Sequence, residues 1–297
     1  MPLSGRELDA ARIRDPLLRQ AYTHCAWLLR RSGHPPPPWR SSLPPAKRPH
    51  WDAMIAFCRC ADDLTDDPGV GPGERLRRLD SFEQELRRSL DGHPFRDRRA
   101  TRSRRSQALV CRAFAHFVRE WRIPEDSIWE ASRALRADMA VRDYDTVASL
   151  ERHMHGVSGQ PAIWLGALLE PVDDRARDAA IAWSYGMQTL DFVLDVEEDL
   201  RLDKLYLPLE ELRQCGLVRE DVEEAVAARR MSEPLRGLVG LQTDRARRYL
   251  AAAEQWEFLV RPRGRELVRR SLAQGRMMID SIARTGNDLF ALAGPNP

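Results

Sequence analysis

The sequence predicts an all-α protein folded as a single domain of about ten helices. Apolar residues recur three and four positions apart along almost the whole chain, which is the period of an α-helix. No segment alternates apolar and polar residues as a half-buried strand would. With 297 residues, 43% of them hydrophobic, the chain is long enough for one full core, and no repeat or long linker divides it. We therefore expect residues 1–297 to form one domain.

The expected helices follow one another with turn signals between them. Proline and glycine supply these signals, because proline lacks a backbone N–H and glycine weakens a helix interior. The first 40 residues contain a Pro-rich loop at 35–38, and later breaks fall at DDPG (66–69), GHP (92–94), IPED (123–126), EPVDD (170–174) and RPRG (261–264). The periodic segments are 7–31, 48–67, 73–90, 104–121, 125–142, 146–170, 174–202, 219–229, 232–256 and 264–288.

Charge and cysteine usage exclude several functional classes. The 47 basic and 45 acidic residues nearly cancel, so no global field attracts nucleic acid or an anionic membrane. The Arg-rich stretch RDRRATRSRR (96–105) contains no aromatic residue for base stacking, and a solvated loop is the simpler interpretation. We expect no nucleic-acid partner and at most peripheral membrane contact.

The sequence also favours a cytoplasmic location. Its five cysteines show neither a disulfide framework nor a metal-ligand spacing, as suits a reducing compartment. No apolar run approaches the roughly 20 residues of a membrane span, and the N-terminus MPLSGRELDAARIRD lacks the apolar core of a secretory signal.

The stretch AFCRCADDLTDDPG (56–69) carries the first candidate site. Asp62 and Asp66 lie one turn apart on one face of the expected helix, with Asp63 and Asp67 displaced together to one side. All four occupy the last turn, where the helix dipole is already negative and carboxylates destabilise. A polar surface cap would explain one or two of them. Four are better explained by a divalent cation, and oxygen ligands without a calcium-binding loop favour Mg²⁺ that shares phosphate oxygens with a substrate.

A second acidic stripe lies in QTLDFVLDVEEDLRLDKLYLP (188–208). Asp191, Asp195 and Asp199 follow at four-residue intervals, with Glu198 beside them. Asp191 and Asp195 are embedded in apolar sequence, where ionised carboxylates are costly unless paired or metal-bound. Helix salt bridges to Arg201 or Lys204 would explain Asp199 and Glu197 but leave the other two unexplained.

Together the two stripes predict a clamp for Mg²⁺ and a diphosphate. If two acidic helices face each other across a central cavity, they can hold cations that withdraw electrons from a leaving pyrophosphate. Such a clamp would promote ionisation of an allylic substrate.

The motifs that carry these residues resemble those of the squalene/phytoene synthase family over roughly residues 40–285. They are LPPAKRPHWDAMIAFCRCADDLTDD (43–67), DYDT (143–146), GVSGQPA (156–162) and QTLDFVLDVEEDLRLDKLYLPLEEL (188–212). The resemblance implies an isoprenoid-synthase fold around a central cavity, and a Mg²⁺-dependent prenyltransferase that ionises an allylic prenyl diphosphate. It also implies that a second prenyl chain captures the carbocation.

The resemblance assigns roles residue by residue. Roughly two or three Mg²⁺ ions would be bound with the diphosphate. Their ligands would be Asp62, Asp63 and Asp66 from one side and Asp191, Asp195 and Asp199 from the other, with Asp62, Asp66, Asp191 and Asp195 as the catalytic acids. The substrate would be bound by Arg48, Arg59, Lys204, Tyr206 and Gln188. Apart from the resemblance, the eight tryptophans of the sequence, including Trp39, Trp164 and Trp183, would suit the walls of an apolar slot that shields the cation.

Three departures from the family pattern bear on the acceptor. The Ser-Phe pair expected before Leu43 falls in GHPPPPW (33–39), the usual Arg before Tyr144 is Asp143, and the usual Asn and Arg of the second motif are Asp191 and Leu194. Because head-to-head condensation requires cations for two pyrophosphates, these losses point to an acceptor that carries no diphosphate.

Three hypotheses follow. The first, which we take as the principal one, is prenyl transfer to an aromatic, carbazole-like acceptor of secondary metabolism. The second is a head-to-head squalene or phytoene synthase, and the third is a non-catalytic helical relative. In the first case the departing pyrophosphate is a sufficient base for the ring proton. His153 and His155 would point to different faces of their helix, so at most one could reach the pocket.

Overall fold

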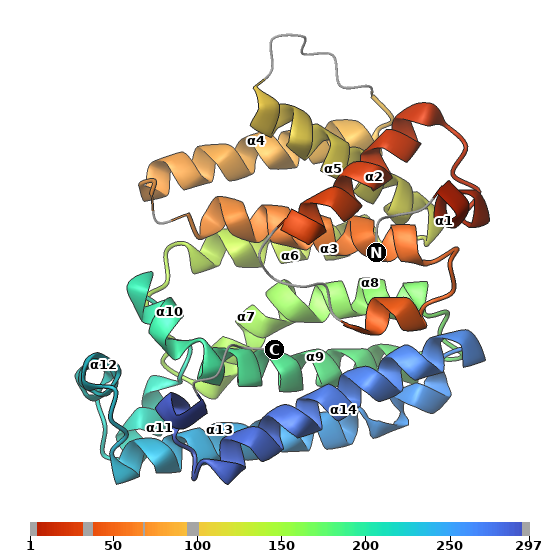
Figure 1. Ribbon diagram of the computed structural model, residues 1–297. Helices are drawn as coiled ribbons and strands as arrows, with labels where there is room; N and C mark the ends of the chain where they lie inside the picture. Colours follow the sequence, from red (N-terminus) through yellow and green to blue (C-terminus); the bar gives the residue numbers. More distant parts are fainter. Residues whose placement is uncertain (1–4, 32–37, 68, 94–100, 293–297) are drawn as a thin grey trace.

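The computed structural model describes residues 5–31, 38–67, 69–93 and 101–292, and these residues are almost entirely helical (Figure 1). Within these ranges no β-strand forms, and extended pairing is limited to isolated bridges between Asp143 and Leu205 and between Pro171 and Val260. The all-α prediction is confirmed. No helix in the described part of the chain is long and apolar enough to cross a membrane.

The helices pack in two groups. In chain order the α-helices are α1 (Gly5–Ala10), α2 (Pro16–Arg31), α3 (Arg48–Thr65), α4 (Pro72–Leu90), α5 (Arg102–Glu120), α6 (Glu125–Asp138), α7 (Val147–Met154), α8 (Gln160–Leu168), α9 (Arg175–Leu194), α10 (Val196–Arg201), α11 (Leu209–Gln214), α12 (Arg219–Ala228), α13 (Glu233–Ala252) and α14 (Pro262–Arg284). Shorter turns are η1 (Pro38–Ser42), the π-helical turn η2 (His155–Gly159), η3 (Glu254–Leu259) and η4 (Leu289–Leu292).

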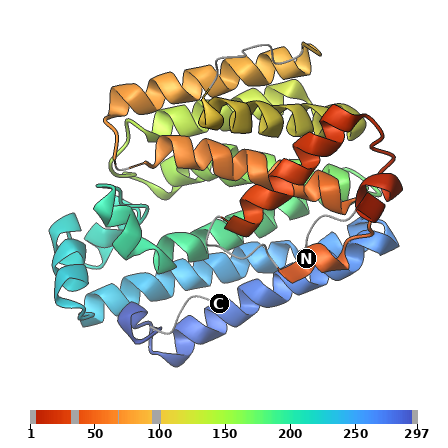
Figure 2. The same ribbon diagram turned by 45° about the horizontal axis from the view of Figure 1, so that its top comes forward.

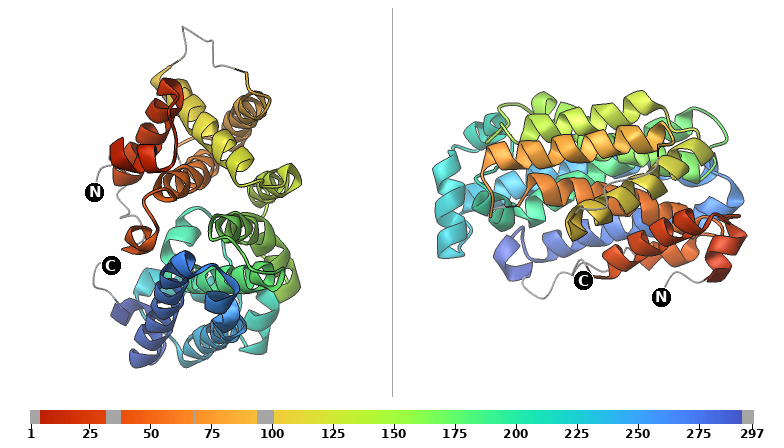
Figure 3. Two further views of the ribbon diagram at one scale, coloured as in Figure 1. Left: turned by 90° about the vertical axis from the view of Figure 1, so that its right-hand side faces the viewer. Right: turned by 90° about the horizontal axis from the view of Figure 1, so that it is seen from above.

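Viewed end-on, α1 to α6 form one group and α7 to α14 the other (Figure 3). In the first group α3 packs against α2, α4 and α5, and in the second α9 packs against α8 and α13. The long α13 and α14 run side by side along the outer edge of the second group (Figure 2). Contact between α3 and α8 joins the groups, and Trp51, Trp164 and Trp256 are among the largest fully buried side chains.

Several predicted helices are divided. The segment 7–31 breaks into α1 and α2, because Arg12 adopts a left-handed φ of 58° and α2 starts afresh at Pro16. The carboxylate of Asp15 accepts from Leu18 N at 2.7 Å and so satisfies a free N–H of the new helix. The segment 146–170 becomes α7, η2 and α8, and α11 was not predicted at all.

The two predicted loops, at 35–38 and 96–105, compare differently with the structure. The Pro-rich loop at 35–38 lies outside the described residues except for Pro38, where η1 begins. The Arg-rich stretch 96–105 is described from Thr101 onward, and there it is helical rather than a loop, because Thr101 caps α5 by accepting from Arg104 N at 3.3 Å.

The GVSG sequence explains why η2 can approach α6 closely. A Cβ atom on Gly156 would lie 2.1 Å from Cβ of Ala134 on α6, a distance that real side chains do not tolerate. Glycine here brings η2 and the start of α8 against α6, and this contact forms one wall of the cavity described below.

Candidate active site

The first acidic motif lies at the C-terminal end of α3. The helix ends at Asp66, whose N–H donates to Asp62 O at 3.0 Å, so Asp62 and Asp66 share a face one turn apart, as predicted. Both are exposed to solvent, and the C-terminal end of α3 lies on the same side of the molecule as α10 (left in Figure 1).

Arginines from α4 compensate this acidic helix end. Arg75 donates through Nη1 to Thr65 O at 3.2 Å, and Arg78 forms an ion pair of 2.9 Å with Asp67. Asp67 also accepts from Gly69 N at 2.9 Å, and this hydrogen bond is the main reason that its pKa is lowered. Asp67 therefore has a structural role in the turn, which separates it from the other three aspartates.

The second acidic motif is not one continuous helix. The predicted helix 174–202 breaks at Asp195, whose φ and ψ of −97° and 11° end α9 and precede α10. Backbone hydrogen bonds still join the acids at successive turns: Asp195 N donates to Asp191 O and Asp199 N to Asp195 O, each at 2.8 Å. The spacing of four is preserved across the break, but the direction of the chain is not.

The two motifs lie within each other's electrostatic field. Burial raises the pKa of Asp199 to about 8, with further contributions from Asp195, Glu198 and Asp66 of the first motif. Asp66 is affected similarly: burial raises its pKa, and the charge of Asp138 adds to the shift. The predicted juxtaposition of the stripes is thus present in the structure.

Two further aspartates lose their protons less readily than a free carboxyl, because their pKa values are raised. Asp62 opens to solvent on one side, but burial of its carboxyl against the cavity wall, followed by the charges of Asp66 and Asp63, raises its pKa to about 7. For half-buried Asp191, burial and the charge of Asp195 likewise raise the pKa to about 7. We call Asp62, Asp66, Asp191, Asp195 and Asp199 the acidic clamp.

The acidic clamp suits Mg²⁺ bound together with a diphosphate. Across the described residues, no three carboxylate, imidazole or thiol groups converge on one point. Each ion would therefore take few oxygens from the protein and the rest from water and phosphate, as Mg²⁺ commonly does. Such ions would favour the ionised carboxylates that crowding now disfavours. The ligand assignments, including Asp63, stay predictions.

Asp138, the last residue of α6, is a central group that the sequence analysis missed. Its buried carboxylate accepts from Tyr144 Oη and from Tyr206 Oη, both at 2.8 Å, and Lys204 Nζ donates to it as well. His153 Nε2 lies 3.7 Å from the same carboxylate. The sequence carried little signal for Asp138, because a lone aspartate near a helix end is also explained by a polar cap, and the predicted helix 125–142 extended beyond it.

This network changes the environment expected for Lys204 and Tyr206. Lys204 is buried and ion-paired with Asp138, not exposed beside Glu197 or Asp199, yet its charge still partly offsets the burial that raises the pKa of Asp66. The ring of Tyr206 stacks on Phe192 at a centroid distance of 4.3 Å. Both predicted substrate-binding residues therefore border the acidic clamp, with their polar groups engaged by Asp138.

The two predicted arginines have different positions. Arg59 lies one turn before Asp62 on α3, and its charge lowers the pKa of that carboxyl. Arg48 begins α3, 14 residues or about 21 Å of helix away from Asp62. Its guanidinium donates to Glu7 Oε1 at 3.1 Å and to two backbone carbonyls, so the structure contradicts its assignment to phosphate binding beside Asp62.

His153 and His155 lie in different surroundings. His153 is half-buried beside Asp138, and burial lowers its pKa. His155 instead contacts Tyr185 Oη at 3.1 Å and Gln160 at 3.2 Å. Only His153 therefore belongs to the surroundings of the acidic clamp.

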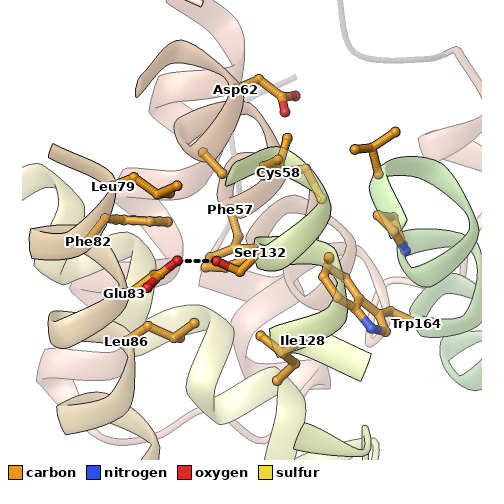
Figure 4. A pocket seen from close by; sticks show the side chains of 15 residues that line it. Phe57, Cys58, Asp62, Leu79, Phe82, Glu83, Leu86, Ile128, Ser132 and Trp164 are labelled. Carbon is orange, nitrogen blue, oxygen red and sulfur yellow. Dashed lines mark hydrogen bonds between the residues drawn. The ribbon is translucent and has the colours of Figure 1, made fainter. Parts of the chain in front are cut away.

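An apolar cavity opens beneath Asp62 (Figure 4). Its space is about 530 Å³, counting the part open to solvent. Helices α3, α4, α6 and α8 and the turn η2 line it, mostly with aliphatic and aromatic side chains. Trp164 is one of them, as predicted, and its Nε1 donates to Ser127 Oγ at 2.7 Å.

The other predicted aromatic wall is absent from this cavity. Trp183 and Trp39 are not among its lining residues but pack on each other edge to face, with ring centroids 5.8 Å apart. Trp183 also contacts Trp256, and these rings belong to the hydrophobic core. Gln188 lies on α9 one turn before Asp191, so it remains a candidate for substrate contact.

Asp143, which stands where the family pattern has an arginine, is paired with a basic residue of this chain. Asp143 forms an ion pair with Arg219, the first residue of α12, whose side chain is buried. Arg219 also pairs with Asp203 at 2.8 Å and Glu223 at 2.6 Å. Asp143 is therefore neutralised within the protein, and it offers no evidence against a second diphosphate. Leu194 is half-buried and packs against the core.

Comparisons with known proteins agree with this geometry. The squalene/phytoene synthase family model matches residues 39–295. Phytoene synthase of Arthrospira platensis is 24% identical over 261 residues, which are 84% of this chain and 79% of that protein. The 15-cis-phytoene synthase of Synechococcus elongatus is 26% identical over 260 residues, with the same two coverages.

Solved structures show the same architecture. A squalene synthase from Alicyclobacillus acidocaldarius superposes with a TM-score of 0.79 at 25% identity, over 94% of this chain and 99% of that one. A dehydrosqualene synthase solved with a ligand superposes with a TM-score of 0.78 at 20% identity, over 95% of this chain and 93% of the other. The expected isoprenoid-synthase fold is confirmed.

Proposed function

We propose that this chain, which belongs to the squalene/phytoene synthase family, condenses two prenyl diphosphates head to head. Members of the family are prenyltransferases that release diphosphate, and this protein is a prenyltransferase. The squalene- or phytoene-type reaction was the alternative in the sequence analysis, and it now takes precedence over transfer to an aromatic acceptor.

One observation carries the proposal. The charge of Asp66 in the first motif contributes to the raised pKa of Asp199 in the second, so the two acidic motifs lie near each other, and Asp62 of the first motif lines an apolar cavity. This is the arrangement needed to hold a diphosphate at one end and an apolar chain at the other. Lys204 and Arg59, whose charges partly offset the rise in the pKa values of Asp66 and Asp62, supply positive charge nearby.

Each part of the site would have a defined task. Mg²⁺ held by the acidic clamp would neutralise the charge that develops on the leaving diphosphate. Asp138 would fix Lys204 and Tyr206 at the border of the clamp. The cavity walls, including Phe57 and Trp164, would exclude water from the allylic cation and stabilise it with their ring faces. The second prenyl chain would then capture the cation.

The arguments for an aromatic acceptor have weakened. One was the unpaired negative charge of Asp143, which Arg219 in fact neutralises. Another was a slot walled by tryptophans, but Trp39 and Trp183 pack in the core. A non-catalytic relative is disfavoured because Asp62, Asp66, Asp195 and Asp199 of the clamp stand where the family pattern has acidic residues, and Asp191 adds a further carboxylate.

Leu194 still favours aromatic transfer as a second candidate. It directly precedes Asp195 and contributes no charge where the family pattern has an arginine. A site with fewer cations would suit one diphosphate and a neutral, electron-rich acceptor, such as a carbazole-like ring.

Product analysis distinguishes the candidates. The protein would be incubated with Mg²⁺ and allylic diphosphates of increasing length, alone and with aromatic acceptors, and products would be identified by mass. We expect a dimeric prenyl hydrocarbon, or its cyclopropyl diphosphate precursor, without any acceptor. Products that form only with an aromatic compound would replace this proposal by the second candidate.

A further inference from the structure

The cavity beneath Asp62 contains one polar link between two of its walls. Glu83 on α4 and Ser132 on α6 both line the cavity, and Ser132 Oγ donates to Glu83 Oε1 (Figure 4). We propose that this Glu83–Ser132 crossbar limits the length of the prenyl chain that the cavity accepts. The inference rests on the proposed function, because it assigns the cavity to a prenyl chain.

The position of the crossbar supports this role. Figure 4 shows it between Asp62, which is exposed to solvent, and the fully buried side chains of Leu86 and Ile128. Along α4 the lining residues are Leu79, Phe82, Glu83 and Leu86, so the crossbar lies about 6 Å along the helix from Leu79 and about 4.5 Å from Leu86. A chain extending from a diphosphate at the clamp would meet the crossbar before it filled the cavity.

The crossbar is firmly held. Arg136 on α6 contacts Glu83 Oε1 at 3.0 Å and also pairs with Asp80 at 2.7 Å on the outer surface. The Glu83 side chain is 17% exposed. An apolar chain that displaced it would leave its carboxylate with fewer partners in an apolar wall, and this costs free energy. Shorter chains avoid that cost.

The residues beyond the crossbar are held in place independently of it. Trp164 lines the cavity and is fixed by its hydrogen bond to Ser127, which in turn donates to Gln160 at 2.6 Å. Leu86 and Ile128 are fully buried and belong to the core. Removal of the Glu83 side chain should therefore lengthen the cavity by the volume of that side chain rather than collapse its inner end.

Four variants test the proposal. Glu83→Ala removes the crossbar, Ser132→Ala removes only its hydrogen bond, and Glu83→Gln keeps the bond and the size of the side chain. Asp80→Ala is the matched control, because it deletes the other acidic partner of Arg136 outside the cavity. For each, KM and kcat would be measured with allylic diphosphates one isoprene unit apart, together with the binding of their unreactive thiolodiphosphate analogues.

We expect Glu83→Ala to raise the preference for the next longer chain, as the ratio of kcat/KM values, by about tenfold or more. Ser132→Ala should shift it in the same direction but less, while Glu83→Gln and Asp80→Ala should retain the original preference. An unchanged preference in Glu83→Ala, or an equal shift in Asp80→Ala, would overturn the proposal.

Failure of the proposed function would look different. If the protein released no pyrophosphate from any allylic diphosphate, the binding series with the analogues would still report which chain lengths fit. A shift in that series on removal of Glu83 would support the crossbar, and an unchanged series would refute it.

Discussion

The acidic clamp and a second group of buried polar residues handle charge in opposite ways. Glu211 on α11 accepts from Gln242 at 2.7 Å and pairs with Arg245, and Arg245 donates to Gln242 at 2.7 Å. All three residues are buried and every charge has a partner. In the clamp, by contrast, Asp62 and Asp199 adjoin other carboxylates, and their pKa values are raised to about 7 and about 8.

The difference separates a structural polar group from a functional one. A satisfied network joins helices, here α11 to α13, and its disruption leaves a buried charge without a partner. Carboxylates that repel one another oppose folding, and a protein retains them where a cation or substrate supplies the missing charge. Burial of charge alone would not have distinguished the two regions.

The largest expected effect is on catalysis. Asp62→Ala or Asp195→Ala should lower pyrophosphate release by about 10³-fold or more, because each removes a predicted oxygen ligand of the metal ions. The helical circular dichroism should be unchanged, and the melting temperature of the metal-free protein should not fall. A variant with normal turnover would remove that residue from the clamp.

Asp67→Asn is the contrast within the same motif. Its carboxylate is committed to Gly69 N and Arg78, so the substitution should reduce activity only partly. A loss as large as that of Asp62→Ala would assign Asp67 to the clamp after all.

The second prediction addresses the structural network. Arg245→Ala should lower the free energy of unfolding by about 3 kcal/mol, because Glu211 would keep a buried charge without its cation. Activity per folded molecule should stay close to that of the unmodified protein. Chemical denaturation with a parallel turnover assay checks both. A loss of activity without a loss of stability would contradict a purely structural role for Arg245.

The third prediction concerns Lys204. Lys204→Ala should raise the KM for the prenyl donor about tenfold and also lower kcat, because charge on the pyrophosphate grows toward the transition state. Removing Lys204 also leaves Asp138 without its cation, so Lys204→Ala combined with Asp138→Asn separates the two effects. If the double variant recovered stability and the original donor KM, Lys204 would act only as the partner of Asp138.

The fourth prediction is a dependence of stability on pH in the metal-free protein. Asp62 and Asp191 have folded-state pKa values of about 7 and Asp199 has one of about 8, above the ordinary value of 3.8, so the folded state binds more protons than the unfolded chain between these limits. The free energy of unfolding should therefore fall as pH rises from about 5 to 8, measured in the presence of a chelator. Asp62→Asn should flatten this slope, and an equal slope would argue against a strained Asp62.

Sequence periodicity was sufficient to predict the all-α fold class and to identify the aspartates of the acidic clamp. Asp62 and Asp66 lie one turn apart because a single helix carries them, and local spacing determines that geometry. The break at Asp195 was not predicted, because its spacing of four fits an unbroken helix equally well. A helix broken there leads into the turn that brings Lys204 to Asp138.

Contacts between residues distant in the sequence could not be derived in this way. Asp143 meets Arg219 and Asp138 meets Lys204 only after helices far apart in the chain have packed. Arg48 shows the converse error: it was assigned to the site by motif, although 14 residues of helix separate it from Asp62. Helix length alone would have excluded that assignment.

The stoichiometry of donor binding tests the central claim most directly. With Mg²⁺ and an unreactive prenyl thiolodiphosphate, isothermal titration should saturate at two molecules per protein chain, because head-to-head condensation requires two donors in one site. Asp195→Ala, which removes a predicted metal ligand, should weaken this binding. Saturation at one molecule, even at high concentration, would contradict the account and return the chain to transfer onto an acceptor without a diphosphate.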